Sequence, residues 1–95
     1  MKIETVNDKR LAALIKAGGA SAKGLDPKAV RKLWRQLQAL EAAETIQQVQ
    51  TMPGWNLHPL PPHENKWAMW VTGNWRLTFY LRDGAIHDLD LEDYH

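Results

Sequence analysis

The clearest pattern of apolar and polar positions lies in the last third of the chain, residues 65–95. Residues 75–81 alternate with a period of two, as expected for a strand that is buried on one face only. The apolar run 67–71 precedes them, and residues 85–91 resume the alternation. Thr72-Gly73-Asn74 and Arg82-Asp83-Gly84 separate these segments and have the composition of tight turns, because Gly and Asn tolerate positive φ. We therefore predict three consecutive antiparallel strands.

This alternation gives the predicted sheet one apolar and one polar face. From residues 75–81, the apolar face receives Trp75, Leu77, Phe79 and Leu81. The polar face receives a guanidinium, a hydroxyl and a phenol, from Arg76, Thr78 and Tyr80. In residues 85–91 the alternation sets Leu89 and Leu91 against Asp88 and Asp90. We expect functional groups on the polar face and at the chain end beside it.

The pattern before residue 45 predicts two helices. Asn7 or Asp8 can cap the first, whose apolar positions are followed by the helix-ending pair Gly18-Gly19. Asp26-Pro27 starts the second, with Asp as the cap and Pro at the first helical position. The apolar stripe of this helix has spacings of three and four: Val30, Leu33, Trp34, Leu37 and Leu40. The two helices can pack as a hairpin on the apolar face of the sheet, with Trp34 wedged between them.

The remaining segments connect these elements. Thr45 is a candidate cap for a short turn whose Ile46 and Val49 point inward, and residues 55–60 are the expected first strand of the meander. Pro59 limits that strand to an edge or a bulge. Residues 61–66 form a stiff polar loop, whereas residues 3–6 fit either an edge strand or a lead-in. The predicted fold is a two-layered α+β domain over residues 1–95, with two N-terminal helices on one face of a small antiparallel meander.

Composition excludes several classes of protein. The 95 residues suit one domain, and 44% apolar with 24% charged residues is typical of a globular protein. The absence of cysteine excludes disulfides and thiolate metal sites and fits a cytoplasmic protein. No apolar run approaches the ~20 residues that span a bilayer, and the first residues lack the apolar core of a signal peptide.

The net charge of +1 is unevenly distributed. Residues 1–50 hold nine Lys and Arg against five Asp and Glu, whereas residues 51–95 hold three against six. The basic helical half is either a docking surface for phosphate or an acidic partner, or a solvated helix surface.

An ordered set of short motifs gives the chain a family resemblance. The motifs are Gly24-Leu25-Asp26-Pro27, Leu57-His58-Pro59-Leu60, Trp67, the run Gly73 to Phe79, Asp83-Gly84, and the run Asp88 to His95 with its terminal Asp-Tyr-His. Together they resemble the HigB branch of the RelE-type toxins, also called plasmid-maintenance killer proteins. The resemblance covers nearly the whole chain and implies the RelE-like fold.

The resemblance implies a cytoplasmic, ribosome-dependent endoribonuclease that cuts mRNA in the decoding site. It also implies a helix-turn-helix antitoxin of the HigA-like kind, through which alone the toxin contacts operator DNA. The family's chemistry needs no metal or other cofactor. The ribose 2′-hydroxyl attacks the neighbouring phosphate, so the protein must supply a base, an acid for the leaving 5′-oxygen, and a cation for the extra negative charge.

Motif matching assigns these roles to residues of this chain. His58 and His95 are the acid/base candidates, because imidazole exchanges a proton near neutrality. Asp93 and Tyr94 would position His95 and the substrate, and Arg76 would hold the scissile phosphate. Around them, the candidate RNA-binding residues are Lys66, Trp70 and Tyr80. A metal site built from His58, His63, Asp93 and His95 matches no ligand spacing, so none is predicted.

The chain departs from the family pattern where cations are replaced by Pro61, Trp70 and Tyr80. One charge-assisted phosphate contact is worth roughly 1.5–3 kcal/mol. Trp70 and Tyr80 can instead stack on bases, worth roughly 1–3 kcal/mol each, or form an aromatic surface for the antitoxin. One alternative is therefore a weakly active or inactive relative that mainly binds its antitoxin and tunes operon repression. Another is an RNA-binding module without chemistry.

Overall fold

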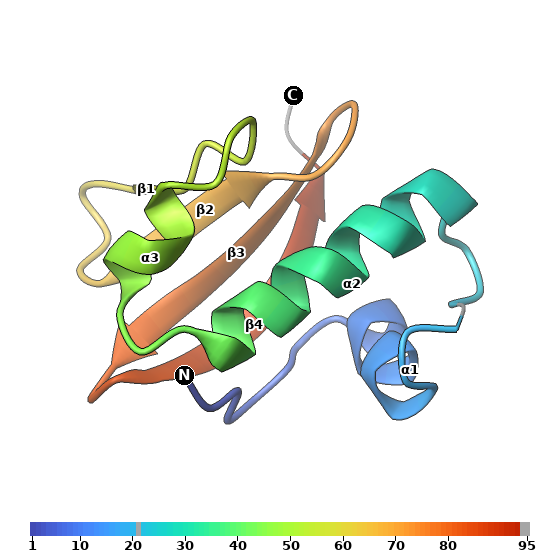
Figure 1. The fold of residues 1–95 in the computed structure, drawn as a ribbon, viewed down its shortest axis with the longest axis horizontal. Helices are drawn as coiled ribbons and strands as arrows, with labels where there is room; N and C mark the ends of the chain where they lie inside the picture. Colours follow the sequence, from blue (N-terminus) through green and yellow to red (C-terminus); the bar gives the residue numbers. More distant parts are fainter. Residues whose placement is uncertain (21, 94–95) are drawn as a thin grey trace.

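The helices and the sheet form two layers (Figure 1), and the buried apolar side chains form one core between them. The computed structural model describes residues 1–20 and 22–93, and the helices in this part of the chain lie on one face of an antiparallel sheet. The helices are α1 (Lys9–Lys16), α2 (Pro27–Ala42) and α3 (Ile46–Gln50). The strands are β1 (His58–Pro59), β2 (Lys66–Trp70), β3 (Trp75–Arg82) and β4 (Ala85–Asp93). Their order in the sheet is β1-β2-β3-β4, which confirms the predicted α+β fold with a meander.

The helix caps follow the sequence signals. Asp8 accepts hydrogen bonds from the amides of Arg10 and Leu11 at the start of α1, and Asp26 accepts one from Lys28 at the start of α2. The predicted stripe of α2 buries Val30, Leu33, Leu37 and Leu40 against the sheet, and Gln36, which was not predicted to be buried, joins them.

The start of α3 is capped in a different way from the prediction. Thr45 occupies the N-cap position, but among the described residues its hydroxyl makes no capping hydrogen bond. The side chain of Gln48 instead accepts from the amide of Glu44 at 2.7 Å. Ile46 and Val49 point inward as predicted.

The first strand is shorter than predicted. Of residues 55–60, only His58 and Pro59 form a ladder with β2. Asn56 takes a left-handed φ of 51°, which breaks the extended backbone, and Pro59 has no amide to donate. Trp55 nevertheless accepts a hydrogen bond from the amide of Trp70 at 2.9 Å, so the segment still follows β2.

The strand β4 contains a bulge that the alternation of 85–91 did not predict. Thr78 pairs with Asp90 but Tyr80 pairs with His87, so β4 has one more residue than β3 between these pairs. Asp88 lies in this interval, with a φ of 53°. The extra residue shifts the phase of the strand, and Ile86 is consequently buried together with Leu89 and Leu91.

The N-terminal segment runs beside β4 at this bulge. Ile3 and Val6 form parallel bridges with Ile86 and Leu89, which answers the open question about residues 3–6 in favour of an edge addition. The hydroxyl of Thr5 accepts a hydrogen bond from the amide of Asp88 at 2.7 Å. The segment therefore satisfies the backbone of the bulge as well as the free edge of the sheet.

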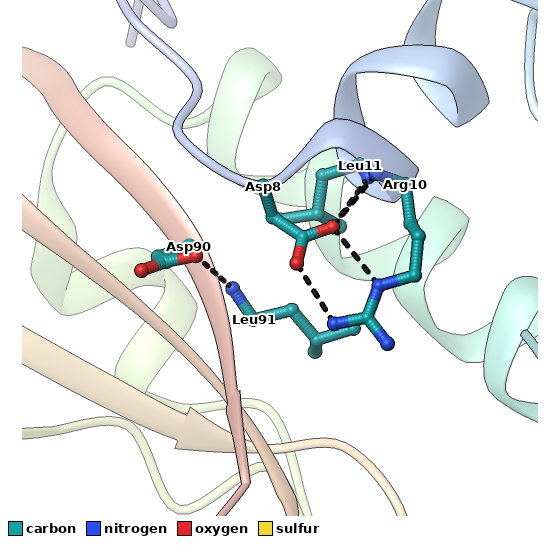
Figure 2. Close-up of polar contacts among 5 residues, drawn as sticks. All are labelled: Asp8, Arg10, Leu11, Asp90 and Leu91. Atoms are coloured by element: carbon teal, nitrogen blue, oxygen red, sulfur yellow. Dashed lines mark hydrogen bonds and ion pairs between the residues drawn. The ribbon is translucent and has the colours of Figure 1, made fainter. Parts of the chain in front are cut away.

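The start of α1 is anchored by a carboxylate close to β4. Figure 2 shows Arg10 folded back onto Asp8, with its Nε and Nη2 donating to the carboxylate at 3.2 and 2.8 Å. Burial alone would raise the pKa of Asp8. The hydrogen bonds from Arg10 and from the Leu11 amide, together with the Arg10 charge, outweigh burial and leave this pKa below its ordinary value.

Trp34 packs against the end of α1, as its predicted wedge position requires. A Cβ atom added to Gly19 would lie 2.4 Å from Cδ2 of the Trp34 ring. Gly19 also has a φ of +87°, whereas Gly18, at +64°, has open space around the same position. The contact between α1 and α2 therefore depends on the missing side chain at residue 19.

We predict that Gly19→Ala lowers the free energy of unfolding by about 1–3 kcal/mol more than Gly18→Ala does. Both substitutions strain a left-handed residue, but only the first also forces Trp34 out of place. Urea unfolding monitored by circular dichroism measures the difference, and equal losses in the two variants would contradict the proposed packing.

A second prediction concerns acid stability. Because folding lowers the pKa of Asp8, its contribution to stability is present above the ordinary value of 3.8 and is lost as the pH falls through the folded value. Asp8→Ala should cost about 1 kcal/mol at pH 7, and this difference should shrink below pH 3.8. Asp8→Asn keeps the cap acceptor without the charge, so its loss at pH 7 should be smaller. A constant difference between wild type and Asp8→Ala down to pH 2 would contradict this account.

Candidate functional site

The face of the sheet opposite the helices carries most of the predicted site residues. Residues that pair across antiparallel strands point to the same face, so the register defines three rows of side chains there. These rows are Lys66, Tyr80 and His87; Ala68, Thr78 and Asp90; and Trp70, Arg76 and Glu92, with His58 paired to Ala68 in the middle row. The polar face predicted from residues 75–81 is thus present, and it extends over all four strands that the structure describes.

A cleft of about 470 Å³ opens on this face beside β1. Its lining includes Asn56, His58, Trp70 and Arg76, with the small side chain of Ala68 between the strands. The structure therefore brings two sequence-predicted residues, His58 and Arg76, to one concave surface. Lys66 and Tyr80 lie on the same face but in the next row, outside the cleft lining.

His58 is held by the turn before β1. Its Nδ1 lies 2.5 Å from the backbone oxygen of Asn56. A carbonyl oxygen only accepts hydrogen bonds, so Nδ1 carries the proton of this interaction and Nε2 of the neutral ring keeps a lone pair. The left-handed φ of Asn56, which shortens β1, also brings this carbonyl beside the imidazole. The arrangement suits a side chain that accepts a proton at Nε2.

Trp70 is a fixed aromatic side chain at the rim of the cleft. It is 44% exposed, yet its indole nitrogen donates to the oxygen of Gly73 at 3.1 Å. Its backbone oxygen accepts from Nε2 of the buried Gln36 at 2.8 Å. An exposed ring with its indole and backbone groups engaged provides a preorganised surface for a planar ligand.

Lys32 of α2 places its Nζ 3.7 Å from the centroid of the Trp70 ring. Burial, and secondarily the charge of Arg35, lowers the pKa of Lys32. A similar arrangement surrounds Tyr80, where Nζ of Lys66 lies 5.7 Å and Cζ of Arg82 4.8 Å from the ring centroid. At residues 70 and 80, where the family resemblance led us to expect cations, a cation from another position therefore lies over an aromatic ring.

Glu92 joins three groups of the open face, and sequence reasoning did not identify it. Its carboxylate accepts a very short hydrogen bond from the buried hydroxyl of Thr78 and lies 3.6 Å from Nζ of Lys66. Arg76 is its partner in the strand register. The Thr78 hydrogen bond lowers the pKa of Glu92; burial opposes this, and the charges of Lys66 and Arg76 support it. The only indication in the sequence was that residue 92 lies two positions after Asp90 and therefore points to the same face of the strand.

The C-terminal tripeptide is described only at its first residue. Asp93 stands opposite Trp75, one position beyond the pair Arg76 and Glu92. Because successive strand residues face opposite sides, the side chain of Asp93 is directed to the side of the sheet that carries the helices. Tyr94 and His95 lie outside the described residues, so the roles predicted for all three stay predictions. Within residues 1–20 and 22–93, no group of three His, Asp or Glu side chains is placed to hold a metal ion.

Comparison with known proteins decides the family. A model of RelE-like toxins of the type II toxin–antitoxin system HigB matches residues 4–95. The chain belongs to the HigB-like toxin family. It is also 33% identical over 94 residues to the endoribonuclease HigB of Proteus vulgaris, an alignment that covers 98% of this chain and 99% of that protein. The family confirms the resemblance read from the motifs, and a type II system implies an antitoxin as the partner of this toxin.

Among the described residues of this HigB-like toxin, no helix is long and apolar enough to cross a bilayer.

The His58 geometry predicts its tautomer. When the His58 ring is neutral, long-range ¹H–¹⁵N correlation spectra should show Nδ1 protonated and Nε2 unprotonated, because the Asn56 oxygen fixes the proton on Nδ1. A His58→Gln variant assigns the signals, and the exposed His63 serves as an internal reference. A His58 ring protonated at Nε2 would contradict the described contact.

Proposed function

We propose that this HigB-like toxin is a ribosome-dependent endoribonuclease that inhibits translation by cutting mRNA. The observation that carries the proposal is the cleft that His58 and Arg76 line together. The name of the Proteus vulgaris relative, endoribonuclease HigB, supports the same chemistry. Ribosomes place this activity in the cytoplasm.

The proposed cleavage step uses His58 and Arg76 of the cleft together with the C-terminal residues that the family motifs assign. Nε2 of His58 accepts the proton of the ribose 2′-hydroxyl, and the 2′-oxygen attacks the adjacent phosphorus. As this bond forms, the bond to the 5′-oxygen breaks, and His95 donates a proton to the leaving oxygen. The products are a 2′,3′-cyclic phosphate and a 5′-hydroxyl. Arg76 stabilises the negative charge that develops on the phosphate, and Asp93 and Tyr94 position His95 and the substrate.

The aromatic residues around the cleft bind the flanking nucleotides. Trp70 and Tyr80 stack on bases, each worth roughly 1–3 kcal/mol. Lys66 contributes positive charge beside Tyr80, and Lys32 does so beside Trp70. These cations offset the charge that the family pattern would have placed at residues 70 and 80.

The partner is proposed to be a HigA-like helix-turn-helix antitoxin, and the toxin reaches operator DNA only through it. A second candidate function, a weakly active or inactive relative that mainly binds this antitoxin, is favoured by Pro61. This exposed residue leaves the loop after β1 without the cation expected there. The experiment below separates the two functions.

We expect His58→Ala and Arg76→Ala each to slow single-turnover mRNA cleavage on programmed ribosomes by about 10²–10⁴-fold, because each removes a group that acts in the transition state. Primer extension locates the cut and gives its rate. His63→Ala, an exposed histidine of the nearby loop, is the matched control and should cleave normally.

Unaltered cleavage by both site variants would remove the roles assigned to His58 and Arg76. A wild-type toxin that binds its antitoxin tightly but neither cuts mRNA nor arrests translation would favour the second candidate function.

A further inference from the structure

Two cations of the open face, Lys66 and Arg76, flank the carboxylate of Glu92. Glu92 lies 3.6 Å from Nζ of Lys66 and pairs with Arg76 across the β3–β4 ladder. The carboxylate of Glu92 accepts a hydrogen bond from the hydroxyl of Thr78. Thr78 is only 1% exposed, so a buried group holds this carboxylate in place.

We propose that Glu92 is a positioning residue of the nuclease site, which orients Lys66 and Arg76 and lowers the affinity of these cations for the ground-state phosphate. This inference rests on the proposed function, because it takes the phosphodiester of RNA as the ligand of the two cations. In this proposal Glu92 contacts neither the reacting atoms nor the general base His58.

The charges of the cluster fit the course of the reaction. Lys66 and Arg76 carry two positive charges and Glu92 one negative charge, so the cluster has a net charge of +1 before RNA binds. This balances the single negative charge of a phosphodiester. During the attack of the 2′-oxygen the phosphate gains further negative charge, and cations held only partly by Glu92 can shift toward it. Interactions that strengthen in the transition state raise the rate, whereas equal binding of both states does not.

The lowered pKa of Glu92 agrees with this arrangement. The Thr78 hydrogen bond is its largest cause, and Lys66 and Arg76 both contribute through their charges. The carboxylate is therefore ionised at neutral pH and remains part of the charge balance throughout the reaction.

The test separates ribosome affinity from the cleavage step. Single-turnover cleavage of a labelled mRNA is measured against the concentration of programmed ribosomes, at several salt concentrations. For Glu92→Gln we expect the half-saturating concentration to fall about tenfold and the maximal rate to fall at least as much. The dependence of log affinity on log salt should steepen by about one unit, since one more cation becomes available to phosphate.

Asp90→Asn is the matched control for loss of a negative charge from the same face. Asp90 pairs with Thr78 in the strand register, its carboxylate accepts from the amide of Leu91 at 3.0 Å, and its charge acts on Arg10 of α1. This variant should leave the maximal rate unchanged. If both variants alter affinity and rate equally, a general charge effect explains the result and the proposal is wrong.

Thr78→Val tests the same idea without changing any charge. It frees the carboxylate of Glu92, so the maximal rate should fall while the half-saturating concentration changes less than twofold. This variant also decides the question if Glu92→Gln does not fold. Wild-type kinetics in either folded variant would overturn the role of Glu92. Because Arg76→Ala reports on the nuclease site itself, normal cleavage by Glu92→Gln with impaired cleavage by Arg76→Ala would reject only the present inference.

Discussion

The bulge at Asp88 determines which side chains of β4 reach the open face. Side chains alternate along a strand, so one inserted residue reverses the phase of everything that follows. Here the insertion allows Ile86 before the bulge, and Leu89 and Leu91 after it, to enter the same core. It thereby directs Glu92 to the opposite face, beside Arg76. The Asp88 amide donates a hydrogen bond to the hydroxyl of Thr5 and so ties the bulge to the N-terminal segment. Residues far from the cleft therefore help to determine which side chains of β4 reach the open face.

Local signals predicted most of the fold, and the exceptions have non-local causes. The caps at Asp8 and Asp26 and the turns around Gly73 and Gly84 depend on short-range conformational preferences, and the structure confirms them. The bulge arises from pairing between strands and with the N-terminal segment. For the same reason the family motifs led to His58 and Arg76 and their cleft, but the sequence did not reveal the contacts of Glu92 with Thr78 and Lys66.

The helix layer contributes to the open face through the end of β2. The buried amide of Gln36 on α2 binds the backbone oxygen of Trp70. A polar residue in a helix stripe normally weakens a core, because an unpaired polar group is costly to bury. Here its amide nitrogen is satisfied by the strand end, and the gain is a fixed position for an exposed ring. Lys32, one turn earlier, adds its charge to the same ring. The mutual arrangement of α2 and the sheet therefore sets both the packing and the aromatic rim of the cleft.

Cations and aromatic rings stand together around the cleft. At residues 70 and 80 the strand carries aromatic rings, while Lys32, Lys66 and Arg82 approach those rings from neighbouring positions. A cation on a strand can contact phosphate directly, whereas a ring with a cation over one face can offer its other face to a base. Such a surface favours unpaired nucleotides, because a base inside a duplex presents no free face. Under the proposed function, the rings at residues 70 and 80 therefore suit single-stranded RNA with its bases exposed.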